Sequence, residues 1–383
     1  NWKNFCSEIE SASAAARISK IANLNKTTLG SLKKKDGTYT TNTQETLETL
    51  GEELLGKEDY DKRKGKHTKN NSPINHEEIN NFINKERLWK AIEETKNKKA
   101  PGPDNIYNEM IKESKHIITN PLLRIYRACM KTGYTPKIWQ KSNSAIIAKP
   151  GKPDYSNPRA YRIIALTSNM LKILETLVLW HMKDDLGMEE AMTKNQYGFK
   201  KGSSTEAAII KLIERVQRAL QNKQHAIGCF IDIKGAFDNV PYETIKRALN
   251  NSRAKGMIGD WIYDMVTNRS ITLEHNGVKV TKKISKGCPQ GGVLSPFIWN
   301  IDLFDPIIKE LAKRNGGQAF ADDLLIVQVG ENIDILTRRT EELVNQVVKW
   351  CNNIGLTIAA EKTEIIFWTR STKASPKKIK IGT

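Results

Sequence analysis

The sequence predicts an α+β protein built around an antiparallel sheet with helices on one face. Three observations support this prediction. From residue 226 onward, short apolar runs alternate with amphipathic helical patterns. Asn276-Gly277 separates two strand-like runs and predicts a two-residue hairpin turn. The runs Gln318–Phe320 and Leu324–Val327 flank Asp322-Asp323, which predicts a second hairpin with aspartates at its turn. Hairpins pair neighbouring strands antiparallel, and helices between them can cover the sheet.

Residues 1–75 are predicted to form an N-terminal extension followed by a polar, basic linker. A helix is expected from Phe5 to Leu24, where alanine and isoleucine supply apolar positions. From Gly51 to Asn75 the chain is polar and contains the basic run Lys62–Lys64, so we expect a loosely held arm. We favour a solvated charge run over a nucleic-acid contact for this arm.

Residues 76–225 are predicted to form a second region, which opens with helices and contains a strand pair. Asn75 is a suitable cap for the first helix. Ser203 and Glu206 form a capping box for a longer helix, in which apolar residues repeat at Ile209, Leu212, Ile213, Val216 and Leu220. The other expected elements are a helix through Leu88, Trp89 and Ile92, a turn at Pro101–Asp104, a helix at Leu122–Met130, and strands at Ser144–Ala148 and Ile163–Leu166.

Residues 226–383 are predicted to form a third region, which holds the catalytic chemistry described below. Ser295-Pro296 pairs a capping residue with a proline suited to the first position of a helix. Only 21 residues follow Lys362, too few for an independently packed domain. Beyond the two hairpins, the expected elements are strands at Ala226–Ile233 and Ile365–Trp368 and helices at Pro241–Leu249, Trp261–Val266 and Thr337–Cys351.

The composition fits a basic protein with a polyanionic partner. The chain has 383 residues and a net charge of +18. Lysine and arginine contacts to phosphates release counterions, so this excess suits nucleic acid, although it also serves solubility. Five scattered cysteines show neither metal-binding spacing nor a disulfide framework, which favours a reducing, intracellular compartment. No apolar run could span a membrane, and no signal-peptide pattern opens the chain.

Two acidic clusters indicate the chemistry. Phe230-Ile231-Asp232 and Phe320–Asp323 each place carboxylates where an apolar strand ends. Two such charges about 4 Å apart repel by roughly 4 kcal/mol at an effective dielectric constant near 20. Two Mg²⁺ ions, for which Mn²⁺ can substitute, would remove that repulsion and support in-line phosphoryl transfer. The pair Asp184-Asp185 is an internal contrast, because its polar surroundings predict a solvated helix end.

Four segments in this order resemble motifs A, B, C and D in the palm of a reverse transcriptase. They are Phe230–Asp238, Gly287–Pro296, Phe320–Asp323, and Gly355-Leu356 with Lys362-Thr363. Other segments resemble the non-LTR retrotransposon enzymes, of LINE type and similar to arthropod jockey elements, namely Ala100–Asp104, Ala160–Leu166, Gln196–Phe199, Gly202–Thr205 and Trp299-Asn300. The resemblance implies a right-hand polymerase fold with fingers in residues 76–225 and a palm and the start of the thumb connection in residues 226–383. It also implies that the palm holds a ferredoxin-like antiparallel sheet with helices on one face and that the thumb is largely absent.

The resemblance also implies a role for individual residues. Asp232 and Asp322 would bind two catalytic metal ions, with Asp323 as a less essential carboxylate and the main-chain carbonyl of Ile233 as an added ligand. Phe237 would exclude a ribose 2′-hydroxyl, although a plain core aromatic is the alternative interpretation.

Five further residues would contact the incoming nucleotide. Gln290 and Gly291 lie on a glycine-rich turn where the backbone can approach it closely. Lys149 and Arg162 would bind the triphosphate, and Lys362 would donate a proton to pyrophosphate. Each of these three cations is also compatible with an ordinary surface charge.

The expected activity is RNA-directed DNA polymerisation, with an RNA template, a DNA primer and deoxynucleoside triphosphates as partners. The enzyme would act as a nuclear or cytoplasmic ribonucleoprotein, within a larger polyprotein whose endonuclease and C-terminal segments are not in this chain. Two alternatives stay open: a viral-type RNA-dependent RNA polymerase, and an inactive relic that only binds nucleic acid. Three positions depart from the family pattern, which usually has proline at Ile163, glycine at Asn105 and tyrosine at Phe320.

Overall fold

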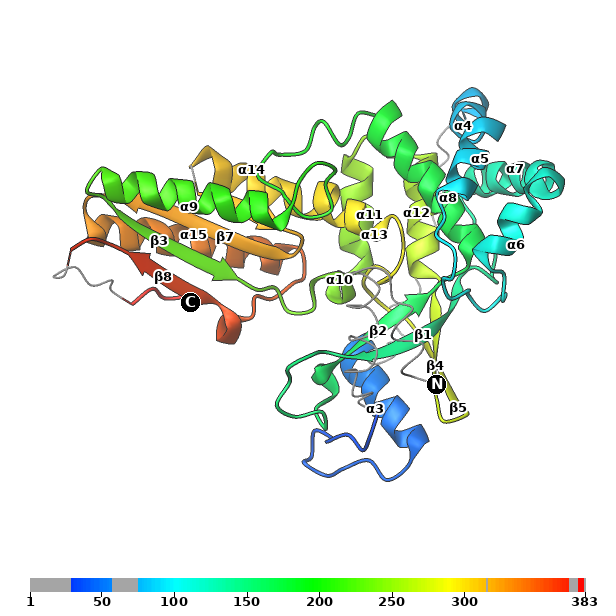
Figure 1. The fold of residues 1–383 in the computed structure, drawn as a ribbon, viewed down its shortest axis with the longest axis horizontal. Helices are drawn as coiled ribbons and strands as arrows, with labels where there is room; N and C mark the ends of the chain where they lie inside the picture. Colours follow the sequence, from blue (N-terminus) through cyan, green and yellow to red (C-terminus); the bar gives the residue numbers. More distant parts are fainter. Residues whose placement is uncertain (1–28, 57–74, 315, 372–377, 382–383) are drawn as a thin grey trace, which may run out of the picture.

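The computed structural model describes residues 29–56, 75–314, 316–371 and 378–381 (Figure 1). The predicted helix Phe5–Leu24 and the basic run Lys62–Lys64 lie outside these residues. Two four-stranded sheets with surrounding helices organise the described part of the chain, which agrees with the predicted α+β class. No helix within that part combines the length and apolarity needed to cross a bilayer. The expectation that a thumb is largely absent stays a prediction.

The first sheet has the strand order β2-β1-β4-β5. β1 and β2 pair antiparallel, which confirms the predicted strand pair. β4 and β5 form the hairpin predicted at Asn276-Gly277, where both residues have positive φ angles. β4 runs parallel to β1, so a hairpin from the third predicted region completes a sheet begun by the second. The strands are β1 (Lys141–Ala148), β2 (Tyr161–Leu166), β4 (Ser270–His275) and β5 (Val278–Lys283). The boundaries between the predicted regions stay a prediction.

The second sheet has the strand order β6-β7-β3-β8, and every neighbouring pair is antiparallel. The hairpin predicted at Asp322-Asp323 is confirmed as the connection between β6 and β7. In Figure 1 the β3 arrow points toward α10 and the first sheet, so this end of the sheet faces the middle of the molecule. The strands are β3 (His225–Ile231), β6 (Gly317–Phe320), β7 (Asp323–Gly330) and β8 (Glu364–Trp368).

Helices pack on both faces of the second sheet, so the prediction of helices on one face was wrong. Successive residues of a strand point to opposite faces. Cys229 and Ile231 of β3 belong to the main core together with side chains of α14 and α15. Ala226 packs on the other face against Val216 and Ala219 of α9. β3 therefore has small or apolar residues on both faces, and each face binds helices. These helices are α9 (Thr205–Gln221), α14 (Asp305–Lys313) and α15 (Ile333–Asn353).

The remaining helices lie mostly where the sequence predicts them, with differences at their ends. The side chain of Ser204, not Ser203, caps α9, and Leu294 rather than Ser295 is the N-cap of α13. Ile209 and Ile213 are 50 % and 47 % exposed, because the opposite side of α9 meets the sheet. Besides α9, the helices of this group are α4 (His76–Phe82), α5 (Lys85–Glu93), α6 (Asn108–Glu113), α7 (Lys115–Thr132), α8 (Asn169–Trp180), α10 (Ala236–Asn239), α11 (Tyr242–Asn251), α12 (Met257–Thr267) and α13 (Ser295–Ile298).

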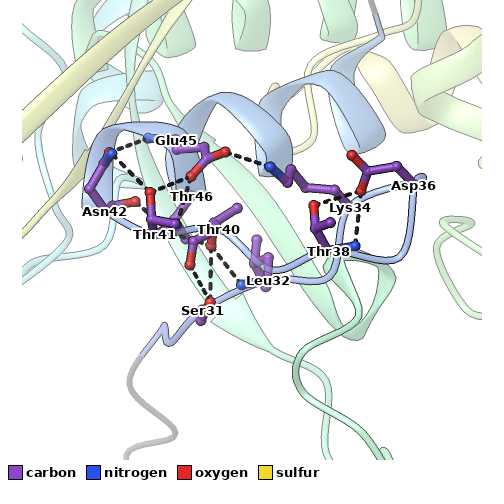
Figure 2. A network of polar contacts seen from close by, with 10 residues as sticks. All are labelled: Ser31, Leu32, Lys34, Asp36, Thr38, Thr40, Thr41, Asn42, Glu45 and Thr46. Carbon is purple, nitrogen blue, oxygen red and sulfur yellow. Dashed lines mark hydrogen bonds and ion pairs between the residues drawn. The ribbon is translucent and has the colours of Figure 1, made fainter.

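A helix that the sequence did not predict, α3 (Thr43–Leu55), packs on the first sheet. Figure 2 shows the polar network at its start, where the Asn42 side chain accepts a hydrogen bond from the Glu45 backbone N–H. The Glu45 carboxylate in turn accepts from Lys34 Nζ at 2.8 Å. Leu47 and Leu50 are fully buried in a cluster with residues of β2 and β4. The predicted linker was therefore wrong for residues 51–55, where this burial outweighs the polar composition.

We expect Leu50→Ala to lower the free energy of unfolding by about 2–5 kcal/mol, because it opens a cavity between α3 and the first sheet. Chemical denaturation followed by tryptophan fluorescence measures the change. Ile117→Ala is the matched control, since Ile117 is 81 % exposed on α7 and its loss should stay within about 0.5 kcal/mol. Equal effects of the two substitutions would contradict the docking of α3.

Candidate active site

Three carboxylates meet at one end of the second sheet. Asp232 follows the last residue of β3, and Asp323 is the first residue of β7. Ile231 pairs with Leu324 in the antiparallel ladder, so Asp232 and Asp323 stand opposite each other one position further along. Asp322 lies beside them in the turn between β6 and β7. The structure thus brings together the three carboxylates that the sequence assigns to one site.

These carboxylates interact through their charges. Burial, and after it the negative charge of Asp232, raises the pKa of Asp322 above its ordinary value of 3.8. Burial also raises the pKa of Asp323, and the charges of Asp322 and Asp232 add to the rise. The cationic side chains of Arg162 and Lys362 oppose the rise at Asp322. A further cation placed among the carboxylates would therefore be favourable.

Lys362 already brings a positive charge to this cluster. It ends a short 3-10 turn, η5 (Ala360–Lys362), and its Nζ lies 2.7 Å from Asp232 Oδ2. The Ala359 backbone N–H donates to the Asp232 carbonyl at 2.7 Å, which holds this turn against the end of β3. The Ile233 side chain is buried, and its backbone pairs with the same segment. Lys362 is thus more than an isolated surface charge.

The donor chemistry of the cluster suits a hard divalent cation. Carboxylate oxygens are the ligands that Mg²⁺ prefers, and Asp232, Asp322 and Asp323 all offer them. Among the residues that the structure describes, no three Asp, Glu, His or Cys side chains already surround a common metal position. One oxygen of Asp232 is instead neutralised by Lys362. A metal ion at that oxygen has to displace the lysine ammonium.

Phe237 belongs to an aromatic group that reaches the acidic hairpin. Its ring centroid lies 5.0 Å from that of Trp299 and 6.0 Å from that of Phe199. The indole N–H of Trp299 donates to the carbonyl of Ala321, the residue before Asp322, at 3.2 Å. Phe237 is half-buried and packs against the main core. The choice between a nucleotide-selecting ring and a plain core aromatic stays a prediction.

The glycine-rich turn of motif B lies between α10 and β2. Gln290 Nε2 donates to Asp238 Oδ2 at 2.6 Å, and the Gln290 carbonyl accepts from the Ala165 N–H at 2.9 Å. Gly291 has a φ angle of +114°, and a Cβ there would lie 2.6 Å from the Ala165 carbonyl oxygen. Glycine is therefore needed at this position for packing against β2, whatever ligand the turn also binds.

Cations of the first sheet act on the acidic site. Arg162 is exposed on β2 opposite Ile147, and its charge lowers the pKa of Asp322. Lys149 follows β1, and its Nζ donates to the Arg159 carbonyl at 2.8 Å. Burial lowers the pKa of Lys149, and the charge of Arg162 adds to this effect. The two cations are thus close enough to repel each other, which makes an anion between them favourable.

Asn105 and Asp185 are two further residues that the sequence analysis singled out. Asn105 has a φ angle of +55°, in the left-handed region that asparagine tolerates, so this turn does without the glycine usual in the family. Asp184 and Asp185 are exposed at the end of a short helical segment, η3 (His181–Asp185), as the sequence predicts, but Asp185 is also paired. It accepts two hydrogen bonds from Arg87 at 2.6 and 2.7 Å and lies 2.7 Å from His181 Nδ1. Arg87 comes from a distant part of the sequence, whereas His181 lies four residues before Asp185 in the same helical segment.

Asp238 is a partly buried carboxyl group to which the sequence assigned no role. Burial raises its pKa to about 6, while the charges of Arg269 and Lys149 act in the opposite direction. Its bond to Gln290 orients the amide on the glycine-rich turn. A signal was available in the sequence, because Asp238 follows Phe237 within motif A.

Glu175 is a fully buried carboxyl group, and no sequence pattern indicated it. It is 1 % exposed on the apolar helix α8. Its Oε2 accepts from the Val293 backbone N–H at 3.1 Å, and its Oε1 has no hydrogen-bond partner among the described residues. Burial raises the pKa of Glu175 from 4.5 to about 7. Through this hydrogen bond to Val293, Glu175 holds the motif B segment against α8.

We expect Glu175 to make the stability of the chain depend on pH. The folded chain keeps this proton between the ordinary pKa of 4.5 and about 7, whereas the unfolded chain releases it. The free energy of unfolding therefore falls as pH rises through this window, by about 3 kcal/mol in total. Denaturation of the wild type and of Glu175→Gln at pH 5 and pH 8 measures this. A difference between the two proteins that does not vary with pH would contradict the burial of an ionisable Glu175.

Comparisons with known proteins agree with this geometry. Residues 147–379 match the family described as reverse transcriptase (RNA-dependent DNA polymerase). A probable RNA-directed DNA polymerase from transposon BS of Drosophila melanogaster is 27% identical over 73% of this chain and 32% of its own length. The RNA-directed DNA polymerase from mobile element jockey of the same organism is 27% identical over 80% of this chain and 33% of its own length.

A third similar protein is a putative 115 kDa protein in the type-1 retrotransposable element R1DM of Drosophila melanogaster. It is 27% identical over 75% of this chain and 27% of its own length. The chain thus spans about a third or less of the curated relatives that it matches. These relatives agree with the resemblance to retrotransposon enzymes predicted from the motifs. Because the family match covers more than half of the sequence, the chain belongs to the reverse transcriptase family.

Proposed function

We propose that this chain is an RNA-directed DNA polymerase that extends a primer 3′-hydroxyl along an RNA template. The observation that carries the proposal is the meeting of Asp232, Asp322 and Asp323 at one sheet end, within reach of the charges of Arg162 and Lys362. Carboxylates hold metal ions and cations hold phosphates, so both halves of a nucleotidyl-transfer site lie together. In this proposal the first sheet belongs to the fingers and the second sheet to the palm.

Reverse transcriptases generally use divalent metal ions. We assign the ligands of two Mg²⁺ ions, replaceable by Mn²⁺, to Asp232 and Asp322, with Asp323 and the Ile233 carbonyl in supporting positions. When bound, such ions lower the pKa of the primer hydroxyl and neutralise charge on the leaving pyrophosphate. Lys362 has to release Asp232 Oδ2 for this to occur, because its Nζ lies 2.7 Å from that oxygen. The freed ammonium can then donate a proton to pyrophosphate.

The other site residues bind and select the nucleotide. Arg162 and Lys149 repel each other in the free protein, and a triphosphate between them would relieve that repulsion. Gln290 and Gly291 form the wall against which the nucleotide lies, and Asp238 fixes the orientation of the Gln290 amide. The accessible part of Phe237 fills the volume that a ribose 2′-hydroxyl needs.

The proposed partners are an RNA template, a DNA primer and deoxynucleoside triphosphates, held in a ribonucleoprotein. One relative, from Bradysia coprophila, is named a retrovirus-related Pol polyprotein from the type-1 retrotransposable element R1. We propose that the present chain likewise works as the polymerase segment of a longer polyprotein. The net charge of +18 supports binding to nucleic acid.

We expect Asp232→Asn and Asp322→Asn each to abolish Mg²⁺-dependent primer extension on an RNA template while primer-template binding survives. Each substitution removes a charged metal ligand and keeps the side-chain shape. Asp184→Asn is the control, because Asp184 belongs to the other Asp-Asp pair of the chain. Extension assays with dNTPs and a filter-binding measurement test both statements. A primer-extension rate above a few per cent of the wild-type rate in both variants would contradict the assignment of Asp232 and Asp322 as metal ligands.

We expect Phe237→Val to admit ribonucleotides. The ring excludes a 2′-hydroxyl by its volume, so a smaller side chain removes a clash and adds no attraction. Single-nucleotide incorporation of an rNTP and the matching dNTP, by variant and wild type, gives the selectivity ratio. An unchanged ratio of rNTP to dNTP incorporation would mean that Phe237 is a core aromatic and does not select the sugar. A wild type that prefers rNTPs would instead support the RNA-dependent RNA polymerase alternative.

A further inference from the structure

The turn of the acidic hairpin has an unusual backbone for its sequence. Phe320 pairs with Asp323, so Ala321 and Asp322 form a two-residue turn. Ala321 has a φ angle of +57°, in the left-handed region that residues with a Cβ rarely adopt. The hairpin between β4 and β5 uses Asn276-Gly277 for the same task, and these residues favour positive φ angles by themselves. The conformation of Ala321 therefore has to be imposed by contacts from outside the hairpin.

Gln196 supplies those contacts. Its side chain is 0 % exposed, and its amide binds both polar groups of the Ala321 backbone. Gln196 Oε1 accepts from the Ala321 N–H at 3.2 Å, and Gln196 Nε2 donates to the Ala321 carbonyl at 3.3 Å. The same Oε1 also accepts from the Gly198 N–H at 2.9 Å. Trp299 Nε1 is a second donor to the Ala321 carbonyl, at 3.2 Å.

The backbone around Gln196 is fixed to the same sheet. The Tyr197 N–H donates to the Ala319 carbonyl at 2.8 Å, and the Ala319 N–H donates to the Asn195 carbonyl at 2.8 Å. Residues 195–197 therefore run along β6, the edge strand of the second sheet. Asn300 Nδ2 donates to the Gly198 carbonyl at 2.7 Å and ties this segment to η4 (Trp299–Phe304), the helical segment that follows α13.

The contact leaves no room for a side chain at position 198. A Cβ on Gly198 would lie 2.0 Å from the Ala321 nitrogen, so the two backbones are in direct contact. Gln196, Gly198 and Trp299 together enclose the residue that precedes Asp322. A buried amide that satisfies both polar groups of one residue specifies its conformation strongly, since any other turn would leave buried polar groups unpaired.

We propose that Gln196 is a positioning residue for the metal site. By holding Ala321 in the left-handed conformation, its amide sets the position of Asp322 and Asp323 relative to Asp232. Gln196 itself touches neither substrate nor metal, and it acts only through the hairpin. This inference rests on the proposed polymerase function for its kinetic consequences, but its effect on metal binding can be measured without turnover.

The test replaces Gln196 by methionine, which has a similar shape and forms none of the three hydrogen bonds. We expect the rate of single-nucleotide incorporation at saturating dNTP to fall by about 10- to 100-fold, as small misplacements of reacting groups do. The Mg²⁺ concentration for half-maximal rate should rise, while the KM for dNTP and the affinity for primer-template stay near wild type. Gln318→Met is the matched control, because Gln318 lies on β6 and donates to the Ala208 carbonyl at 3.1 Å, away from the turn.

A rescue and a binding measurement separate positioning from general stability. Glycine adopts positive φ angles without help, so Ala321→Gly added to Gln196→Met should restore part of the lost rate. Mn²⁺ binding at equilibrium, followed by the electron paramagnetic resonance of the free ion, should be weaker in Gln196→Met and partly restored in the double variant. If Gln196→Met does not fold, Trp299→Phe removes the other donor to Ala321 and should weaken Mn²⁺ binding in the same direction.

Three outcomes would overturn the inference. They are a folded Gln196→Met with wild-type Mn²⁺ affinity and rate, an equal loss in Gln318→Met, or a loss that Ala321→Gly does not relieve. If Gln196→Met does not fold, an unchanged Mn²⁺ affinity in Trp299→Phe would overturn the inference instead. If the wild type extends no primer but its Mn²⁺ affinity still depends on Gln196, the proposed function fails and the positioning role stands.

Discussion

Repulsion among carboxylates at the ends of neighbouring strands is the constraint on which the arrangement of this molecule depends. Asp232, Asp322 and Asp323 are placed together by the register of β3 and β7, which the buried side chains of the sheet fix. Burial and mutual repulsion raise the pKa of Asp322 and of Asp323. The surrounding elements either hold these groups in place or bring a positive charge toward them.

Several elements far apart in the sequence hold the carboxylates in place or bring positive charge toward them. The segment after α15 carries Lys362 to Asp232, and the first sheet brings Arg162 close enough to affect Asp322. The motif B turn packs on β2 and binds Asp238 of α10 through Gln290, so it links the first sheet to the helix that follows β3. The hairpin of β4 and β5, which lies between motifs A and B in the sequence, belongs to the same sheet as β2 with its Arg162. The site is therefore a property of both sheets together.

Local patterns allowed the hairpins, the strand ends and the acidic cluster to be predicted from the sequence. Asp232 and Asp322 each follow an apolar run, and this signal needs only neighbouring residues. The features that were missed depend on partners distant in the sequence. α3 is stabilised because Leu47 and Leu50 meet strands more than a hundred residues away, and Glu175 looks like an ordinary polar interruption until Val293 is placed beside it. Gln196 belongs to a quoted motif, but its contact with Ala321 spans 125 residues.

The most direct test of the proposed metal site is a crystal structure of the chain with primer-template, an incoming dNTP analogue and Mn²⁺, with the metal located by its anomalous scattering. We expect two anomalous peaks, each within coordinating distance of Asp232 or Asp322, with the Lys362 ammonium moved away from Asp232 Oδ2 and the triphosphate near Arg162. Peaks elsewhere, or an intact ion pair between Lys362 and Asp232 beside a bound nucleotide, would contradict the claim that this acidic cluster is the metal site of a polymerase.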